Sequence, residues 1–201
     1  MEAMQSLARE HRLILRTLEA FEAYLGYVEA TIAVDRFDLH RFVAFFRDFC
    51  GLNHHDKEET LLFPALLEVG LGWNLDPLSR LRREHDQEQY LMQSLEHSAL
   101  QGEAWSADER QHFLNIAKEF IAFQRSHVRF ENTEVYPRAE RLSETTRARL
   151  TRDVERFDDA MRVRNDRLVE LSEILTRAYA LNERSACEGA NRMARFSARQ
   201  S

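Results

Sequence analysis

The chain has 201 residues, of which 44% are hydrophobic, and its 28 basic and 34 acidic side chains give a formal net charge of −6. That size and content fit one compact domain with an appendage, whereas the acidic balance disfavours nucleic-acid binding, which requires clustered Lys and Arg. Because no window of about 18 residues is free of polar side chains and the polar N-terminus lacks a secretory signal pattern, we expect a cytoplasmic protein that does not insert into a membrane.

The apolar residues recur at steps of three and four, which predicts amphipathic helices and excludes an all-β fold. Four long helices are expected, over about residues 3–32, 37–68, 77–100 and 107–136. Short links make helices that follow each other in sequence neighbours in space. We therefore predict an all-α fold, an up-down-up-down four-helix bundle over residues 1–142.

A fifth helix is expected from a cap at Ser143 to about residue 182. It has an apolar stripe interleaved with many charges. We predict that this helix, residues 143–182, packs on the bundle or forms a contact in a homodimer. Residues 183–201 are expected to form a polar, flexible tail.

Polar residues within the apolar stripes occur twice along the chain. The triplet Arg-Glu-His at 9–11 recurs at 83–85, and the segment HHDKEETLLFP at 54–64 matches HVRFENTEVYP at 127–137. Two similar helical hairpins therefore build the bundle. Each hairpin supplies one His from its first helix and a His-x-x-x-Glu pair from its second.

Residues four apart lie on the same face of a helix, so each His and Glu of a pair can reach one centre. An unpaired carboxylate in a bundle core costs several kcal/mol or is forced to protonate, and a shared metal removes this cost. A single such motif is more often a core histidine or a surface ion pair, but the duplication favours metal binding. The candidate ligands are His11, His54, Glu58, His85, His127 and Glu131.

His55 and Glu59 repeat the spacing about 100° further round the helix, so one pair is expected to face the core and the other its flank. The internal match favours His54 and Glu58, and it leaves His55 as an additional ligand or a residue that supports one. Glu10 and Glu84, which precede two of the candidate ligands, are interpreted as outer partners of imidazoles or as solvated surface acids. The remaining histidines (His40, His97, His112) are expected at the surface. Four tyrosines could supply electrons or protons near the site, but packing is the favoured interpretation for each (Tyr24, Tyr27, Tyr90, Tyr136).

Mixed imidazole and carboxylate ligation suits iron, manganese or zinc. Four imidazoles and two bridging carboxylates offer about eight donor atoms, whereas two octahedral ions need about twelve. The set therefore favours two ions with a solvent-derived bridge and an open coordination position.

These motifs resemble the hemerythrin-like (HHE cation-binding) family, bacterial type, over about residues 5–140. The resemblance implies two non-haem iron ions, Fe2+/Fe3+, with an oxo or hydroxo bridge, and makes manganese and zinc less favoured. It implies that the four histidines are terminal ligands and that Glu58 and Glu131 bridge the ions. The family's oxygen carrier has a further His where Gln89 stands and an Asp one residue after the position of Glu131, so reversible oxygen carriage is not expected.

Several functions remain open at this stage, and no catalytic residue is assigned. The first is a protein that binds or senses O2, NO or a peroxide in oxidative stress, with the fifth helix transmitting the state of the centre. The second is a di-iron oxidoreductase, catalase-like, peroxidase-like or NO-reducing. Iron storage or delivery, including iron–sulfur cluster repair, is a third, and a metal that only stabilises the bundle is a fourth.

Overall fold

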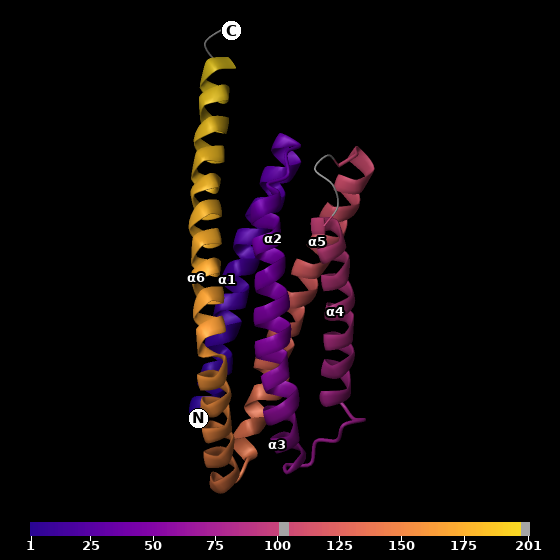
Figure 1. The fold of residues 1–201 in the computed structure, drawn as a ribbon, viewed down its shortest axis with the longest axis vertical. Helices are drawn as coiled ribbons and strands as arrows, with labels where there is room; N and C mark the ends of the chain where they lie inside the picture. The colour runs from indigo at the N-terminus through magenta and orange to yellow at the C-terminus, as the bar shows by residue number, and fades with distance from the viewer. Residues whose placement is uncertain (101–104, 198–201) are drawn as a thin grey trace.

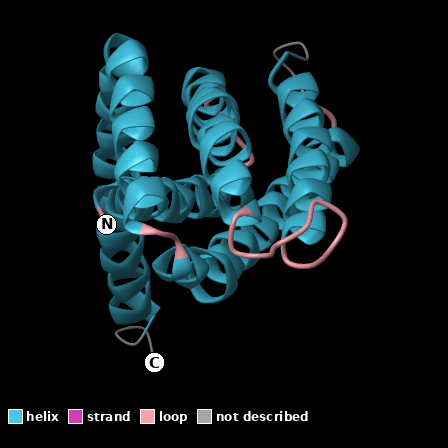
Figure 2. Cartoon of the chain, turned by 90° about the horizontal axis from the view of Figure 1, so that it is seen from below, coloured by secondary structure: helices cyan, strands magenta, loops and turns pink. Residues whose placement is uncertain are grey.

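A computed structural model describes the backbone of residues 1–100 and 105–197, with side chains up to residue 179. The described residues are helical and contain no strand (Figure 2). The helices, in chain order, are α1 (Glu2–Thr31); α2 (Arg36–Phe45), η1 (Phe46–His55), η2 (Glu58–Leu62) and α3 (Phe63–Leu67), which form one continuous rod; α4 (Leu78–Leu100); α5 (Ala107–Phe130), η3 (Glu131–Val135) and η4 (Tyr136–Arg141), a second rod; and α6 (Glu144–Ser197).

The predicted four-helix bundle with an additional C-terminal helix is confirmed. α1, the α2–α3 rod, α4 and the α5–η4 rod surround the core, and an extended loop joins α3 to α4 (Figure 1). α6 packs mainly along α1 and also contacts α2 and η1, so it covers one side of the bundle. Within the described residues, no helix is long and apolar enough to cross a membrane.

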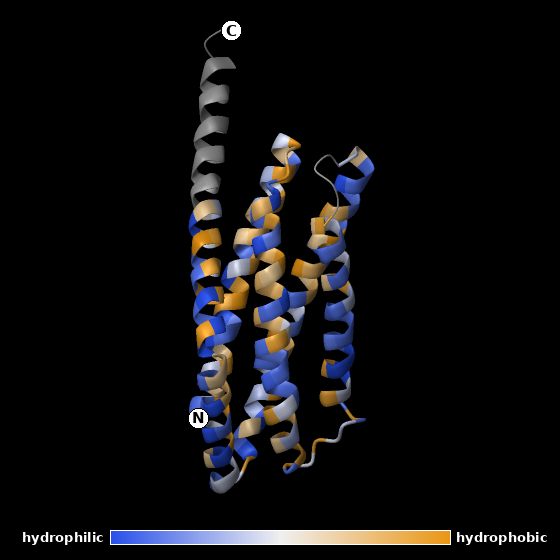
Figure 3. Cartoon of the chain, viewed as in Figure 1, coloured by the Kyte–Doolittle hydropathy of each residue, from blue (hydrophilic) through white to orange (hydrophobic). Residues whose placement is uncertain are grey.

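Local signals in the sequence explain where several helices begin. The Ser106 side chain accepts a hydrogen bond from the Glu109 backbone N–H, and the Glu109 carboxylate accepts one from the Ser106 N–H, which is the expected capping box. The Asp35 carboxylate caps α2 by accepting from the Asp38 N–H at 3.0 Å. Along each helix hydrophobic and hydrophilic residues are interleaved, as Figure 3 shows, so one face is available for the core.

The structure differs from the sequence prediction in two features of the helices. The predicted second helix, residues 37–68, is not a regular α-helix, because its segments η1 and η2 are π-helical. In the other hairpin, η3 is also a π-helical segment. A π-helix has hydrogen bonds from residue i to i+5, and such turns often occur at functional sites. In addition, α6 continues to Ser197, past the expected end near residue 182, so it covers most of the segment predicted as a tail. Residues 198–201 of that segment lie outside the described residues.

Candidate metal centre

The six predicted ligands all lie in the interior of the bundle, each no more than 8% exposed. α1 carries His11, the α2–α3 rod carries His54 and Glu58, α4 carries His85, and the α5–η4 rod carries His127 and Glu131. They lie between two hydrophobic clusters: Leu7 of one is four residues before His11, and Ile14 of the other is three residues after it. The surrounding apolar side chains shield most of these polar groups from water.

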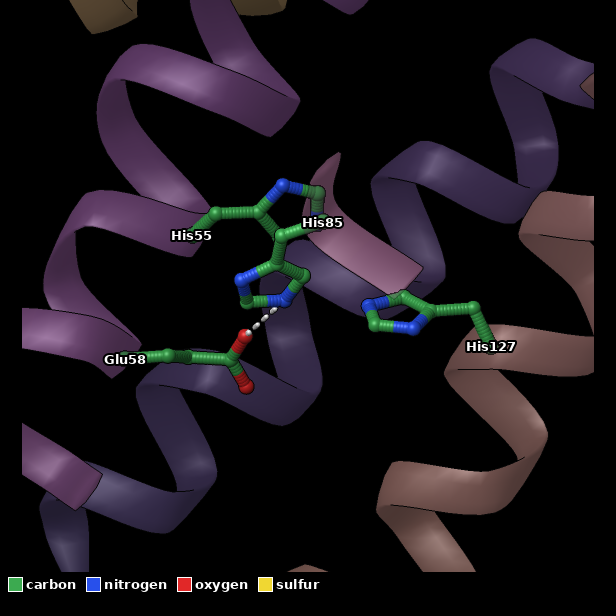
Figure 4. Close-up of side chains that lie close together, drawn as sticks. All are labelled: His55, Glu58, His85 and His127. Carbon is green, nitrogen blue, oxygen red and sulfur yellow. Dashed lines mark ion pairs between the residues drawn. The ribbon is translucent and has the colours of Figure 1, made fainter. Parts of the chain in front are cut away.

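These six side chains, together with His55, form two groups that share Glu58. Each group could hold a metal ion, because its ligand atoms lie within 4.8 Å of one another. We call them position A and position B. Position A consists of His11, His54, Glu58 and Glu131, and position B of His55, Glu58, His85 and His127. Figure 4 shows position B, where His55 and Glu58 come from the α2–α3 rod, His85 from α4 and His127 from the α5–η4 rod.

The two carboxylates lie between positions A and B. Glu131 Oε2 is 3.0 Å from Nε2 of His11, and its other oxygen, Oε1, is 3.3 Å from Nε2 of His127. Glu58 Oε2 is 3.9 Å from Nε2 of His54 and 3.7 Å from Nε2 of His85. Each carboxylate therefore faces imidazoles of both positions, which is the arrangement that a carboxylate-bridged pair of ions requires.

Several buried atoms of the centre have no hydrogen-bond partner. They are His54 Nε2, Glu58 Oε2, His85 Nε2, His127 Nε2 and both oxygens of Glu131. Leaving a buried polar atom unsatisfied costs about 1–3 kcal/mol, and more for a charged group. Because all of them carry or can present lone pairs, cations at positions A and B would satisfy them together, and the donor set fits the metal that the sequence predicts.

The electrostatics of the centre leave the lone pairs of His54 and His55 available. At His127, by contrast, the charge of Glu131 and other nearby carboxylates outweigh burial and raise the pKa of the ring. Burial lowers the pKa of His54 to about 4, although its hydrogen bond to Glu10 acts in the opposite direction. Burial and the neighbouring histidines hold the pKa of His55 well below its usual range. Both rings are therefore neutral at pH 7, and neutral imidazole is the form that binds metal.

The carboxylate pair has opposite shifts. Burial, with the negative charge of Glu131, raises the pKa of Glu58 well above its usual range. Burial acts in the same way on Glu131, but the charges of His127 and His11 outweigh it and hold the pKa of Glu131 well below its usual range. Two close carboxylates that cannot both ionise hold a proton, which a metal ion would displace on binding.

The comparison with protein families agrees with this geometry. The family description "Hemerythrin HHE cation binding domain" matches residues 3–139. The chain belongs to this hemerythrin family. Among curated proteins and among solved structures, no match was found. Hemerythrin domains bind metal ions, usually iron, and positions A and B are groups of side chains that could hold such ions.

Outer hydrogen bonds orient the imidazoles of this hemerythrin domain. Nδ1 of His54 bonds to the Glu10 carboxylate at 2.9 Å, and Nδ1 of His127 bonds to the Glu84 carboxylate at 2.8 Å. In each hairpin the Glu that precedes the first-helix histidine thus supports the second-helix histidine. Of the two interpretations of Glu10 and Glu84, the structure supports the outer partner.

The two first-helix histidines, His11 and His85, each bond to a residue of the other hairpin. Nδ1 of His11 bonds to Asn132 Oδ1 at 3.0 Å, and Nδ1 of His85 bonds to Glu59 at 2.5 Å. Asn132 and Glu59 directly follow Glu131 and Glu58, the two predicted bridging carboxylates, in sequence. Fixing Nδ1 in this way leaves Nε2 of every ring directed at the centre and raises its basicity as a ligand.

The sequence interpretation left His55 open, and the structure places it in position B. His55 is 7% exposed, and its ring stacks on that of His85 with centroids 4.0 Å apart. The expectation that only one of the two adjacent histidines faces the core is wrong, because both lie inside within the π-helical η1. Glu59, the partner in the second pair, does point outward, with its side chain 47% exposed.

Tyr136 lies at the centre, although the sequence interpretation favoured packing over a supply of electrons or protons for this residue. Its hydroxyl donates to Glu58 Oε1 at 2.6 Å and lies 3.1 Å from Nε2 of His11. Phe63 occupies the matching place in the first hairpin. A mismatch of Tyr with Phe between two otherwise similar segments was the available signal. The other three histidines (His40, His97, His112) are exposed, as predicted.

Proposed function

We propose that the chain is a non-haem di-iron protein that binds or reacts with a small oxidant, O2, NO or a peroxide, in sensing or in the response to oxidative stress. The observation that supports this most is the convergence of unsatisfied, buried Nε2 and carboxylate oxygen atoms on positions A and B, with Glu58 and Glu131 between them. When bound, two irons would supply exchange between Fe2+ and Fe3+ and a coordination position for a small ligand.

The protein's own residues define what such a centre can do. Imidazoles of His11 and His54 hold position A, and three imidazoles hold position B, all fixed or packed so that they need little rearrangement. Tyr136 holds a proton against Glu58 Oε1, at the edge of both positions. Aromatic rings stack on the outer faces of the histidines, such as Phe123 on His127, and exclude bulk water.

The Tyr136 hydroxyl favours a second candidate, a di-iron oxidoreductase that is catalase-like, peroxidase-like or NO-reducing. A buried O–H directed at a bridging carboxylate can donate a proton to a reduced oxidant and recover it from solvent. Catalytic disappearance of an oxidant distinguishes this candidate from the sensor, which would bind its ligand stoichiometrically and reversibly.

The test is anaerobic metal analysis with optical spectra, followed by titration with O2, NO and hydrogen peroxide. His54→Ala and Glu131→Ala remove ligands, and His97→Ala, an exposed His on α4, is the matched control. About two irons per chain, lost in the first two variants and kept in the control, are expected. No bound metal, or full retention in all three variants, would overturn the proposal.

The same experiment separates the remaining alternatives. Labile iron without turnover would support storage or delivery, including iron–sulfur cluster repair, and manganese or zinc at full occupancy would replace iron as the metal. Metal that restores folding without reacting would indicate a structural role. A cytoplasmic location and a homodimer are further parts of the proposal, and light scattering on the purified protein tests the second.

A further inference from the structure

A cavity of about 600 Å³ lies beside position B, between η1 and α4. His55, His85 and Glu88 line its inner end. Tyr136 stacks on His11 in position A, with ring centroids 5.0 Å apart. The cavity therefore reaches the centre on the side of position B.

The outer part of the cavity is strongly acidic. Asp56, Glu59, Asp86 and Glu96 line it, and Arg47 is the one Lys or Arg among the lining residues. Arg47 is itself paired, with Asp48 at 2.6 Å and with Glu96 at 3.3 Å. A cleft lined by one sign of charge raises the local concentration of the opposite charge and speeds its arrival. This cavity therefore attracts cations and repels anions.

Glu88 lies at the inner end and resembles the predicted ligands in its geometry. It is 3% exposed, and its Oε2 accepts no hydrogen bond although it lies 3.2 Å from Nε2 of His55. Glu131 Oε2 and Nε2 of His11 face each other in the same way at 3.0 Å in position A. An unsatisfied carboxylate oxygen opposite an imidazole nitrogen is an arrangement that a shared cation stabilises.

We propose that this cavity is the uptake site through which divalent metal cations reach the centre, with Glu88 and His55 as the ligands that receive the ion at its inner end. The acidic outer residues hold the hydrated ion, which prefers oxygen ligands. Glu88 then supplies the first buried oxygen, and the ion moves on to the imidazoles of position B. Glu88 is one turn from His85 on α4, so the transfer needs no movement of the helices.

This inference rests on the proposed metal centre, and its test measures the rate of loading. Metal-free protein is mixed anaerobically with Co2+ in a stopped-flow instrument, and the visible absorption of bound Co2+ reports occupancy. Glu88→Gln is expected to slow uptake at least tenfold while the final number of Co2+ ions per chain stays the same. Glu134→Gln, an exposed acid on another face, is the matched control and is expected to load at the wild-type rate.

A second variant covers the case in which Glu88→Gln does not fold. Asp86→Asn with Glu96→Gln changes only partly or fully exposed side chains at the mouth. It is expected to slow uptake about threefold at low salt, with the difference lost at high salt because the field is screened. Unchanged rates in both variants would overturn the uptake site, as would loss of one Co2+ at equilibrium in Glu88→Gln, which would make Glu88 a permanent ligand. If the wild-type protein binds no metal at all, the proposed function itself fails.

Discussion

Lys57 provides the sharpest test of how α6 is connected to the centre. The side chain of Lys57 is fully buried, and its ammonium donates to Glu10 Oε1 at 2.5 Å and to Asp158 on α6. Glu10 in turn holds His54, so a chain of charged hydrogen bonds leads from α6 to position A. Lys57→Met keeps most of the apolar stem and removes the charge, which leaves the two carboxylates without their common partner.

The expected loss of stability follows from the burial of each partner. Breaking a buried ion pair by removing one partner costs about 3–5 kcal/mol, because the other charge stays buried. Glu10 meets this condition, with its side chain 12% exposed. Asp158 is 36% exposed, so its part of the interaction counts as a surface pair, worth roughly 0–1 kcal/mol. We expect a loss of about 3 kcal/mol, which corresponds to a decrease in Tm of roughly 6–12 °C for a domain of this size.

The assay is urea denaturation of the metal-free protein, with unfolding monitored by circular dichroism. Lys118→Met is the matched control, because Lys118 is the only other lysine and pairs with Glu29 at 2.5 Å on the surface. The control is expected to cost less than about 1 kcal/mol. In a double-mutant cycle, Glu10→Gln with Lys57→Met should lose clearly less than the two single variants add up to, because no uncompensated charge remains.

One result would refute this reasoning directly. If Lys57→Met loses no more stability than Lys118→Met, and the cycle with Glu10→Gln gives a coupling near zero, the buried charges do not interact as the geometry requires. The connection from α6 to His54 would then consist of packing contacts alone. In that case α6 could not transmit the state of the centre through charged hydrogen bonds.

Three further predictions concern the centre itself. His55→Ala should reduce bound Co2+ from about two ions per chain to about one, as counted by metal analysis, and full retention would remove His55 from position B. Tyr136→Phe leaves Glu58 Oε1 without its donor and should cost about 1–3 kcal/mol in denaturation of the metal-free protein, so an unchanged midpoint would contradict the bond. Burial raises the pKa of Glu88 from 4.5 to about 7, so the folded state keeps a proton that the unfolded state loses, and stability falls as pH rises from about 4.5 to 7. That loss amounts to about 3 kcal/mol, and Glu88→Gln should abolish it; equal pH slopes in the two proteins would show that Glu88 is not buried as described.

The fold could be predicted because the hydrophobic pattern and the helix boundaries point to the same structure. The apolar stripe that contains His11 in α1 and the capping box at Ser106 could both be predicted from neighbouring residues alone. The six predicted ligands lie together for the same reason: each occupies a core-facing position of a regular repeat, and two hairpins placed side by side must bring those positions into one layer.

The features that could not be predicted from the sequence depend on backbone geometry and on contacts between residues far apart in the chain. A regular α-helix separates His54 from His55 by about 100°, whereas the π-helical turn of η1 lets both enter the core. Nothing in composition marks such a turn. Lys57 was not singled out, because a lysine between charged residues is typical of a surface, and its partners Glu10 and Asp158 lie far away in the sequence, on α1 and α6.

The two halves of the repeat also explain why positions A and B differ. Aligning the hairpins places His55 opposite Val128, Glu88 opposite Ile14, and Tyr136 opposite Phe63. In the proposed centre, the shared residues would form a symmetric frame for two ions. The unshared residues add an imidazole and an open acidic cavity at position B, and they add a hydroxyl beside position A.

This asymmetry has a chemical consequence. Duplication alone would give two equal ions with no preferred direction of approach. In the proposed function, a neutral oxidant that enters by the cavity would meet position B first, while the Tyr136 hydroxyl lies between Glu58 and His11. If the centre reduces its ligand, Tyr136→Phe should therefore slow turnover without changing how fast the ligand binds, whereas a bulky substitution that narrows the cavity mouth should do the reverse. A sensor without proton transfer would respond only to the second change, so this pair of variants separates the two proposed functions by kinetics.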